Sequence, residues 1–154
     1  MFASRPRSRL RTSRRRSKTW YRRSIPRSQR HLQQGAIGRA REALQRGPEL
    51  AIFSARDHGG LLRTAEFERK AMQYEIGDPL TATRMTQHQL PASLYAPLRV
   101  VLYESEAGHA VFEYDRPSSL FGQFGDERVT AVARELDASL ERVLGQALHS
   151  GEER

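Results

Sequence analysis

The leading candidate for chemistry in this 154-residue chain is the turn Asp57-His58-Gly59-Gly60. It follows a short apolar run at 50–55, which is typical of an internal strand. A histidine at a strand end can act as acid, base or ligand near neutral pH, and glycines allow close approach of the backbone. Because adjacent strand residues point to opposite faces, a catalytic His58 needs a carboxylate or a tyrosine from another element. The alternative, which we favour, is that His58 caps the following turn or bonds a core carbonyl.

A second candidate is the turn at Asp78, which is placed to cap a helix whose first residue is a proline. Thr81 and Met85 fall within that helix, whose first backbone N–H groups suit a small anion or carboxylate. As the cap, Asp78 would already occupy those donors, so structural capping is the favoured role. A shared pocket forms only if the fold brings the two turns together. The predicted ligand-binding residues are Asp57, His58, Asp78, Thr81, Met85 and Tyr114.

Other kinds of chemistry find little support. The absence of cysteine excludes disulfides, thiolate catalysis and cysteine-ligated metal centres. His58, His88 and His109 are separated by 30 and 21 residues, which matches no local ligand motif, so we predict no metal and no cofactor. The chain has no Walker motif, no dinucleotide-binding glycine pattern and no nucleophile elbow. These observations favour a non-enzymatic role, with an enzyme that uses His58 as general acid/base as the alternative.

Positive charge is concentrated at the start of the chain. The formal net charge is +8, but residues 1–30 hold eleven arginines and Lys18 with no acidic residue, which leaves 14 basic against 18 acidic residues in the rest. We predict that residues 1–18 form a disordered Arg/Ser-rich leader, since they cannot bury enough apolar surface to order themselves. Residues 19–150 are then a single mildly acidic domain, followed by a tail at 151–154.

The basic leader leaves several interpretations open. One is nonspecific, salt-sensitive binding of nucleic acid through residues 1–30. Others are an organelle transit peptide, a solvated tail, or residues added by an upstream start codon. No apolar run approaches the roughly 20 residues that span a bilayer, and the start of the chain lacks the apolar core of a secretory signal. We therefore predict a cytoplasmic protein with no membrane partner.

Hydrophobic periodicity predicts the elements that position the two turns. Apolar residues recur at helical spacing over 29–46 and, most clearly, over 126–151. Short helical segments are expected near 61–66, after Asp78 and at Leu90-Pro91. Strands are expected at 19–25, 50–55, 72–76, 98–103 and 110–114. This order predicts an α+β fold, with a largely antiparallel four- to five-stranded sheet covered by two main helices.

Four short motifs occur in order along this domain. They are Leu50-Ala51-Ile52-Phe53 leading to Asp57-His58, Ile76-Gly77-Asp78-Pro79 with Met85 after it, Ala96-Pro97-Leu98-Arg99-Val100 leading to Tyr103-Glu104, and Tyr114-Asp115-Arg116-Pro117. In this series the segment from about Ala36 to Ala147 resembles the bacterial domain of unknown function 302 family. One departure is Asp78, which stands where the family usually has Asn and adds negative charge at the predicted helix start.

The resemblance implies a compact β-α-β4-α fold, similar to the TATA-box-binding-protein-like architecture and often dimeric. It implies no established reaction. Together with the residues above, it predicts a small-ligand-binding or protein-interaction module that forms a homodimer.

Overall fold

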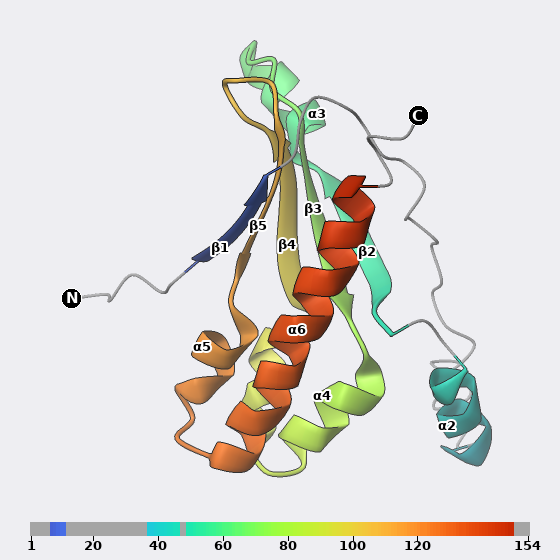
Figure 1. Ribbon diagram of the computed structural model, residues 1–154. Coiled ribbons are helices and arrows are strands. Elements are labelled where there is room, and N and C mark those ends of the chain that lie inside the picture. Colours follow the sequence, from blue (N-terminus) through green and yellow to red (C-terminus); the bar gives the residue numbers. More distant parts are fainter. Residues whose placement is uncertain (1–6, 12–36, 47–48, 150–154) are drawn as a thin grey trace.

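One antiparallel sheet organises the molecule. The computed structural model describes residues 7–11, 37–46 and 49–149. These residues form an α+β fold in which a five-stranded sheet carries a long helix on one face (Figure 1). The strand order is β1-β5-β4-β3-β2 and every neighbouring pair is antiparallel. The strands are β1 (Arg7–Arg11), β2 (Ala51–Asp57), β3 (Ala71–Gly77), β4 (Leu98–Glu104) and β5 (Ala110–Asp115).

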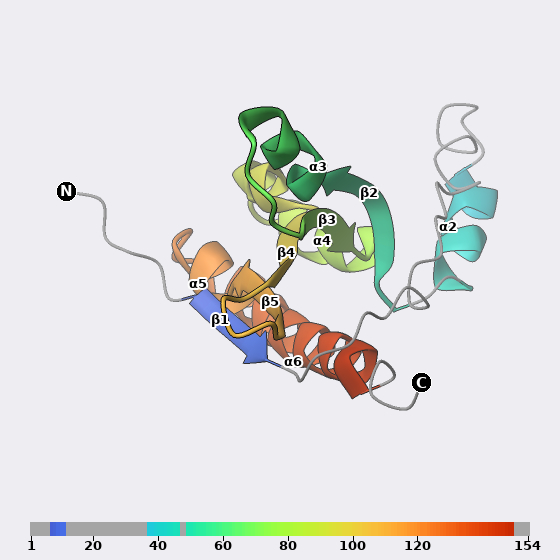
Figure 2. The same ribbon diagram turned by 90° about the horizontal axis from the view of Figure 1, so that it is seen from above.

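The short helical segments between strands lie at the ends of the sheet, whereas α6 (Glu127–His149) runs along its face. The predicted final helix is confirmed, and it lies along one side of the sheet when the molecule is seen from above (Figure 2). The short segments between strands are α3 (His58–Leu62), α4 (Pro79–Thr86), α5 (Pro117–Gly122) and the 3-10 turns η1 (Arg63–Ala65) and η2 (Leu90–Tyr95). Of these, α5 was not anticipated from the sequence.

The other main helix of the prediction, α2 (Ile37–Gln45), stands apart from the sheet in both views and comes closest to α4 (Figures 1 and 2). Its described side chains explain this position, because only Ala43 and Leu44 are even half-buried. The cover of the sheet therefore falls chiefly to α6. The predicted helix start at 29–36 lies outside the described residues.

The core lies between α6 and the sheet. In the register of β4 with β5, Val100 is opposite Tyr114 and Leu102 is opposite Phe112, which places these side chains on the face that α6 covers. Burying each large aliphatic side chain contributes roughly 1.5–3 kcal/mol. The packing of one amphipathic helix against the sheet therefore contributes much of the stability of the fold. The fully buried residues of α6 are Val129, Ala133, Leu140 and Leu144.

Strand β1 corrects the prediction for the leader. It lies within residues 1–18, so the prediction of disorder is wrong for the five residues Arg7–Arg11. The register supplies the physical reason, because all five residues of β1 pair with β5, so the backbone of this segment extends the ladder at the edge of the sheet. Leu10 is paired with the buried Phe112.

Composition alone does not predict strand β1, because composition carries no information about the partner strand β5. The strand expected at 19–25 lies outside the described residues. Across 7–11, 37–46 and 49–149, no helix combines the length and the apolar character needed to cross a bilayer.

Candidate functional site

The fold separates the two turns that the sequence offers as a site. Strands β2 and β3 are antiparallel, with Asp57 opposite Met72 and Ala51 opposite Gly77. The turn after β2 and the turn after β3 therefore lie at opposite ends of the sheet. The seven residues of β2 place them roughly 20 Å apart, at about 3.3 Å per residue. A pocket that unites His58 with Asp78 is not formed.

The turn after β2 is explained by local structure. Asp57 caps α3, because its carboxylate accepts a hydrogen bond of 2.7 Å from the backbone N–H of Gly60. His58 is exposed and lines neither of the two hollows described below. Gly59 is buried against the chain itself, since a Cβ there would lie 2.5 Å from the carbonyl oxygen of Arg69. This geometry gives no support to His58 as a general acid/base.

The turn after β3 is a helix cap, as the sequence predicts. The Asp78 carboxylate accepts hydrogen bonds from the backbone N–H groups of Leu80 and Thr81, at 3.1 and 3.0 Å. It also accepts one of 2.7 Å from the Thr81 hydroxyl. A cap of this kind contributes about 1 kcal/mol to stability. The donors at the start of α4 are thus already satisfied, and an anion has no place there.

The two remaining residues of the predicted set are buried. Met85 packs in the core and also lines a hollow beside α4. Tyr114 lies in the core beneath α6 and lines neither hollow. Of the six predicted residues, Asp78, Thr81 and Met85 come together at one end of the sheet, whereas Asp57 and His58 lie at the other.

An apolar pocket opens at the end of the sheet that carries Asp78. Its volume is about 230 Å³. It is lined by Phe53, Gly77, Asp78, Pro79, Ala82, Met85, Ala96, Pro97, Leu98, Phe121 and Leu136. Two small residues leave space within it. A Cβ on Gly77 would come 3.8 Å from the ring of Phe53, and Ala82 adds only a methyl group to the wall.

Phe53 reaches this pocket through an irregularity in β2. The register places Ile52 opposite Ile76 but Ser54 opposite Glu75, so Phe53 is an extra residue in its strand. A β-bulge of this kind redirects a side chain from its alternating position. The sequence signal was the pair of adjacent apolar residues Ile52-Phe53, which breaks the alternation of a half-buried strand.

A polar cleft of about 440 Å³ adjoins the apolar pocket, between α2, α4 and α6. The two hollows share Asp78 and Leu136 as wall residues. The remaining residues that line the polar cleft are Leu44, Gln45, Glu49, Leu50, Leu80, Thr81, Glu135 and Ser139. Sequence reasoning missed Glu49, Glu135 and Ser139, since they meet only through the packing of α6.

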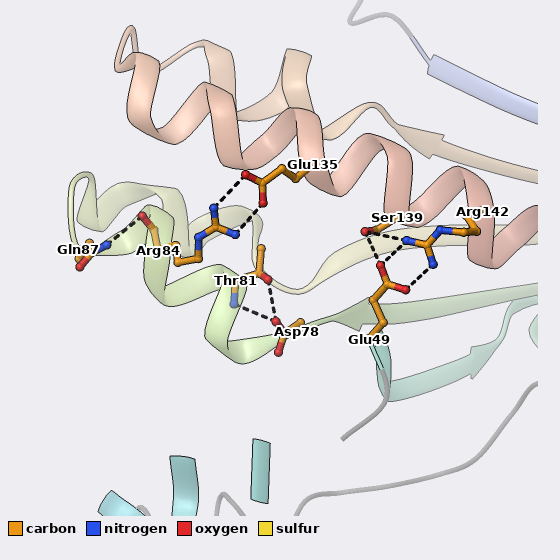
Figure 3. Close-up of polar contacts among 8 residues, drawn as sticks. All are labelled: Glu49, Asp78, Thr81, Arg84, Gln87, Glu135, Ser139 and Arg142. Carbon is orange, nitrogen blue, oxygen red and sulfur yellow. Dashed lines mark hydrogen bonds and ion pairs between the residues drawn. The ribbon is translucent and has the colours of Figure 1, made fainter. Parts of the chain in front are cut away.

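Two ion pairs connect α6 to the structure around the polar cleft (Figure 3). Arg84 of α4 donates two hydrogen bonds to Glu135, at 2.7 and 2.9 Å. Glu49, just before β2, accepts hydrogen bonds from Ser139 at 2.6 Å and from the guanidinium of Arg142. Arg84 lowers the pKa of Glu135 through its hydrogen bonds. Both carboxylates therefore stay ionised at neutral pH.

The Glu49 pair predicts a small loss of stability in acid. Hydrogen bonds from Arg142 and Ser139 lower the pKa of Glu49 from 4.5 to about 2. Because the folded pKa is the lower one, the stabilisation is present above about pH 4.5 and disappears as the pH falls through about 2. The side chains are 45% and 50% exposed, so we expect only a few-fold change in the unfolding equilibrium constant.

Urea unfolding at about pH 6 and about pH 2.5 measures this change. In Arg142→Gln the part of the acid dependence that Glu49 contributes is expected to disappear. Arg134→Gln, which breaks the exposed pair with Glu127 elsewhere on α6, is the matched control and should keep it. Equal acid dependence in wild type and Arg142→Gln would show that the pair contributes nothing.

Metal ligands do not converge. Within the part of the chain that the structure describes, no group of three or more His, Asp or Glu side chains is arranged to hold a metal ion. His88 and His109, the other members of the spaced histidine series, lie on the segment after α4 and in the β4–β5 loop respectively.

Comparisons with known proteins agree with this architecture. A family model described as a domain of unknown function, DUF302, matches residues 29–147. Among solved structures, the crystal structure of an uncharacterised conserved protein DUF302 from Bacillus stearothermophilus is similar, with 14% sequence identity and a TM-score of 0.60. The similarity covers 94% of this chain and 97% of that one, and at this identity it shows the fold alone. None of the curated proteins compared with the chain matches it.

Proposed function

The chain belongs to the DUF302 family of domains of unknown function, and from that premise we propose that it is a non-catalytic binding module for a small ligand. The apolar part of the ligand occupies the apolar pocket beside α4. The observation that carries this proposal is a hollow of about 230 Å³ between six elements and their connections, with space left by Gly77 and Ala82.

The wall of the pocket suits binding better than catalysis. Apolar side chains dominate it, and the largest are the rings of Phe53 and Phe121 and the thioether of Met85. The only ionisable residue in its lining is Asp78, whose carboxylate is already used by the cap of α4. Ligand pockets are typically mostly apolar, with volumes of about 300–1,000 Å³, so this one suits a small ligand or one part of a larger ligand. Each buried methylene would contribute about 0.8 kcal/mol.

Filling the pocket is expected to abolish binding. Benzene is a suitable probe, since it enters dry apolar cavities of about 150 Å³. In ¹H–¹⁵N NMR titrations, benzene should shift the amide signals of residues around the pocket, and Ala82→Phe should remove these shifts by occupying the space. Thr83→Phe, the same aromatic side chain on the neighbouring exposed residue of α4, is the matched control and should bind benzene like wild type.

Two outcomes would contradict the proposal. One is the absence of any benzene-dependent shift at the pocket in the wild-type protein. The other is unchanged binding in a folded Ala82→Phe variant, which would place the probe elsewhere.

A protein-interaction role is the second candidate, and two groups of exposed apolar side chains favour it. Leu90 and Leu94 of η2 are 77% and 76% exposed, and Leu61 and Phe67 near α3 are 64% and 54% exposed. Such side chains are frequent at contacts between proteins. The homodimer implied by the family resemblance would bury one of these groups. Native mass spectrometry of protein purified from its own cells reports the number of subunits and any retained ligand in one measurement.

Nucleic-acid binding through residues 1–30 stays a prediction, because most of these residues lie outside the described ranges. For Arg7–Arg11 the expected disordered leader is replaced by strand β1, which pairs with β5.

A further inference from the structure

We propose that the ligand is amphipathic, with an alkyl or similar apolar part in the apolar pocket and a hydrogen-bond-donating head group in the polar cleft. This inference rests on the proposed function and adds the chemical class of the ligand. Two hollows, one apolar and one polar, lie next to each other at the same end of the sheet.

The two hollows are neighbours and differ in chemistry. They share the wall residues Asp78 and Leu136, so the apolar pocket of about 230 Å³ and the cleft of about 440 Å³ lie on either side of the same two side chains. Leu136 is buried and belongs to the core, while Asp78 is fixed by the cap of α4. Under this proposal, a ligand with one apolar and one polar end extends past these two side chains from the pocket into the cleft.

The lining of the polar cleft offers many hydrogen-bond acceptors and few donors to a ligand. The ionisable residues in its lining are three carboxylates, Glu49, Asp78 and Glu135. Arg84 binds Glu135 and Arg142 binds Glu49, but neither arginine lines the cleft.

The hydroxyl groups in the lining already donate. Thr81 donates to Asp78 and Ser139 donates to Glu49. Each carboxylate oxygen and each hydroxyl oxygen has more than one lone pair, and the exposed amide of Gln45 is the one side chain of the lining that adds further donors. Most of the unused capacity of the wall is therefore to accept. A hydroxyl or ammonium head group matches this wall, whereas a carboxylate head group would meet like charges.

Three probes with the same alkyl chain test the head group. 1-Hexanol, hexylamine and hexanoate are titrated into the full chain near neutral pH, with NMR shifts or calorimetry as the readout. We expect hexanol and hexylamine to bind at least tenfold more tightly than hexanoate. Tighter binding of hexylamine than of hexanol identifies a cationic head group, and equal binding identifies a hydroxyl. Lengthening the chain by one methylene should tighten binding by about fourfold until the pocket is full.

A single charge in the cleft should shift this preference. Gln45 is exposed and lines the cleft, so Gln45→Lys adds a cation there with little risk to folding. We expect Gln45→Lys to weaken hexylamine and strengthen hexanoate binding, each by about threefold. Gln87→Lys makes the same change at an exposed residue outside both hollows and should leave the order of the three probes unchanged.

The outcomes separate this inference from the proposed function. If all three probes bind equally and Ala82→Phe abolishes binding of each, the apolar pocket stands and the donor head group is overturned. Tightest binding of hexanoate also overturns it. If no probe binds to the wild-type chain, the proposed function fails with it.

Discussion

Replacing Phe121 by Ala is expected to destabilise the protein by about 3–5 kcal/mol. Phe121 lies in α5, its exposed fraction is zero, and it packs in the core as well as lining the apolar pocket. Its ring meets that of Tyr95 edge to face, with ring centroids 6.2 Å apart. Truncation removes both the buried area and this contact, which is worth about 0.5–1.5 kcal/mol beyond its area. Urea unfolding followed by circular dichroism measures the loss.

The same substitution at an exposed site is the control for this prediction. Phe67 is 54% exposed and lies 5.9 Å from the guanidinium of Arg69, so Phe67→Ala should cost no more than about 1 kcal/mol. If Phe121→Ala proves too unstable to purify, Phe121→Leu keeps most of the volume and should show a smaller loss. A Phe121→Ala loss as small as that of Phe67→Ala would show that α5 is not part of the cooperative core.

Much of this fold could be predicted from the sequence because periodicity is a local signal. Alternating residues in β3 and β5 and the apolar face of α6 locate these elements, and the Asp78-Pro79 pair identifies a helix start. The sequence-based predictions that proved wrong concern structure that depends on a partner strand elsewhere in the chain. Residues Arg7–Arg11 form a strand because they pair with β5, which lies far along the chain, and no local composition rule contains that information.

The sequence predicted the two turns of the candidate site but not their relative positions, which depend on how the strands pair. His58 and Asp78 each follow a strand and stand at the start of a helix, so they look equivalent along the chain. In an antiparallel sheet, however, consecutive strands end at opposite ends of the sheet. The predicted sheet type therefore already argued against a common site for His58 and Asp78. The pocket wall also depends on Phe53, which faces it through a bulge, and on Phe121, which belongs to a helix that the sequence did not indicate.

Gly59→Ala is expected to destabilise the protein by about 1–3 kcal/mol, because added volume in a tightly packed place forces the backbone to move. A Cβ at Gly59 would lie 2.5 Å from the carbonyl oxygen of Arg69 and 2.9 Å from the backbone nitrogen of Ala71. Both atoms belong to the backbone at or just before the start of β3, so neither can yield as a flexible side chain would. The midpoint of urea unfolding measures the change.

Gly145→Ala is the matched control, and its expected sign is opposite. Gly145 lies within α6, and a Cβ there would have no heavy atom within 4 Å beyond its own chain neighbours and helix backbone. The substitution should therefore stabilise the helix by up to about 1 kcal/mol. A neutral Gly59→Ala would mean that the glycine is not required by the packing of α3, and ligand approach at the His58 turn would regain support. Because this turn is roughly 20 Å from the apolar pocket, benzene binding should be unchanged in folded Gly59→Ala, which separates the two ends of the sheet by function as well as by position.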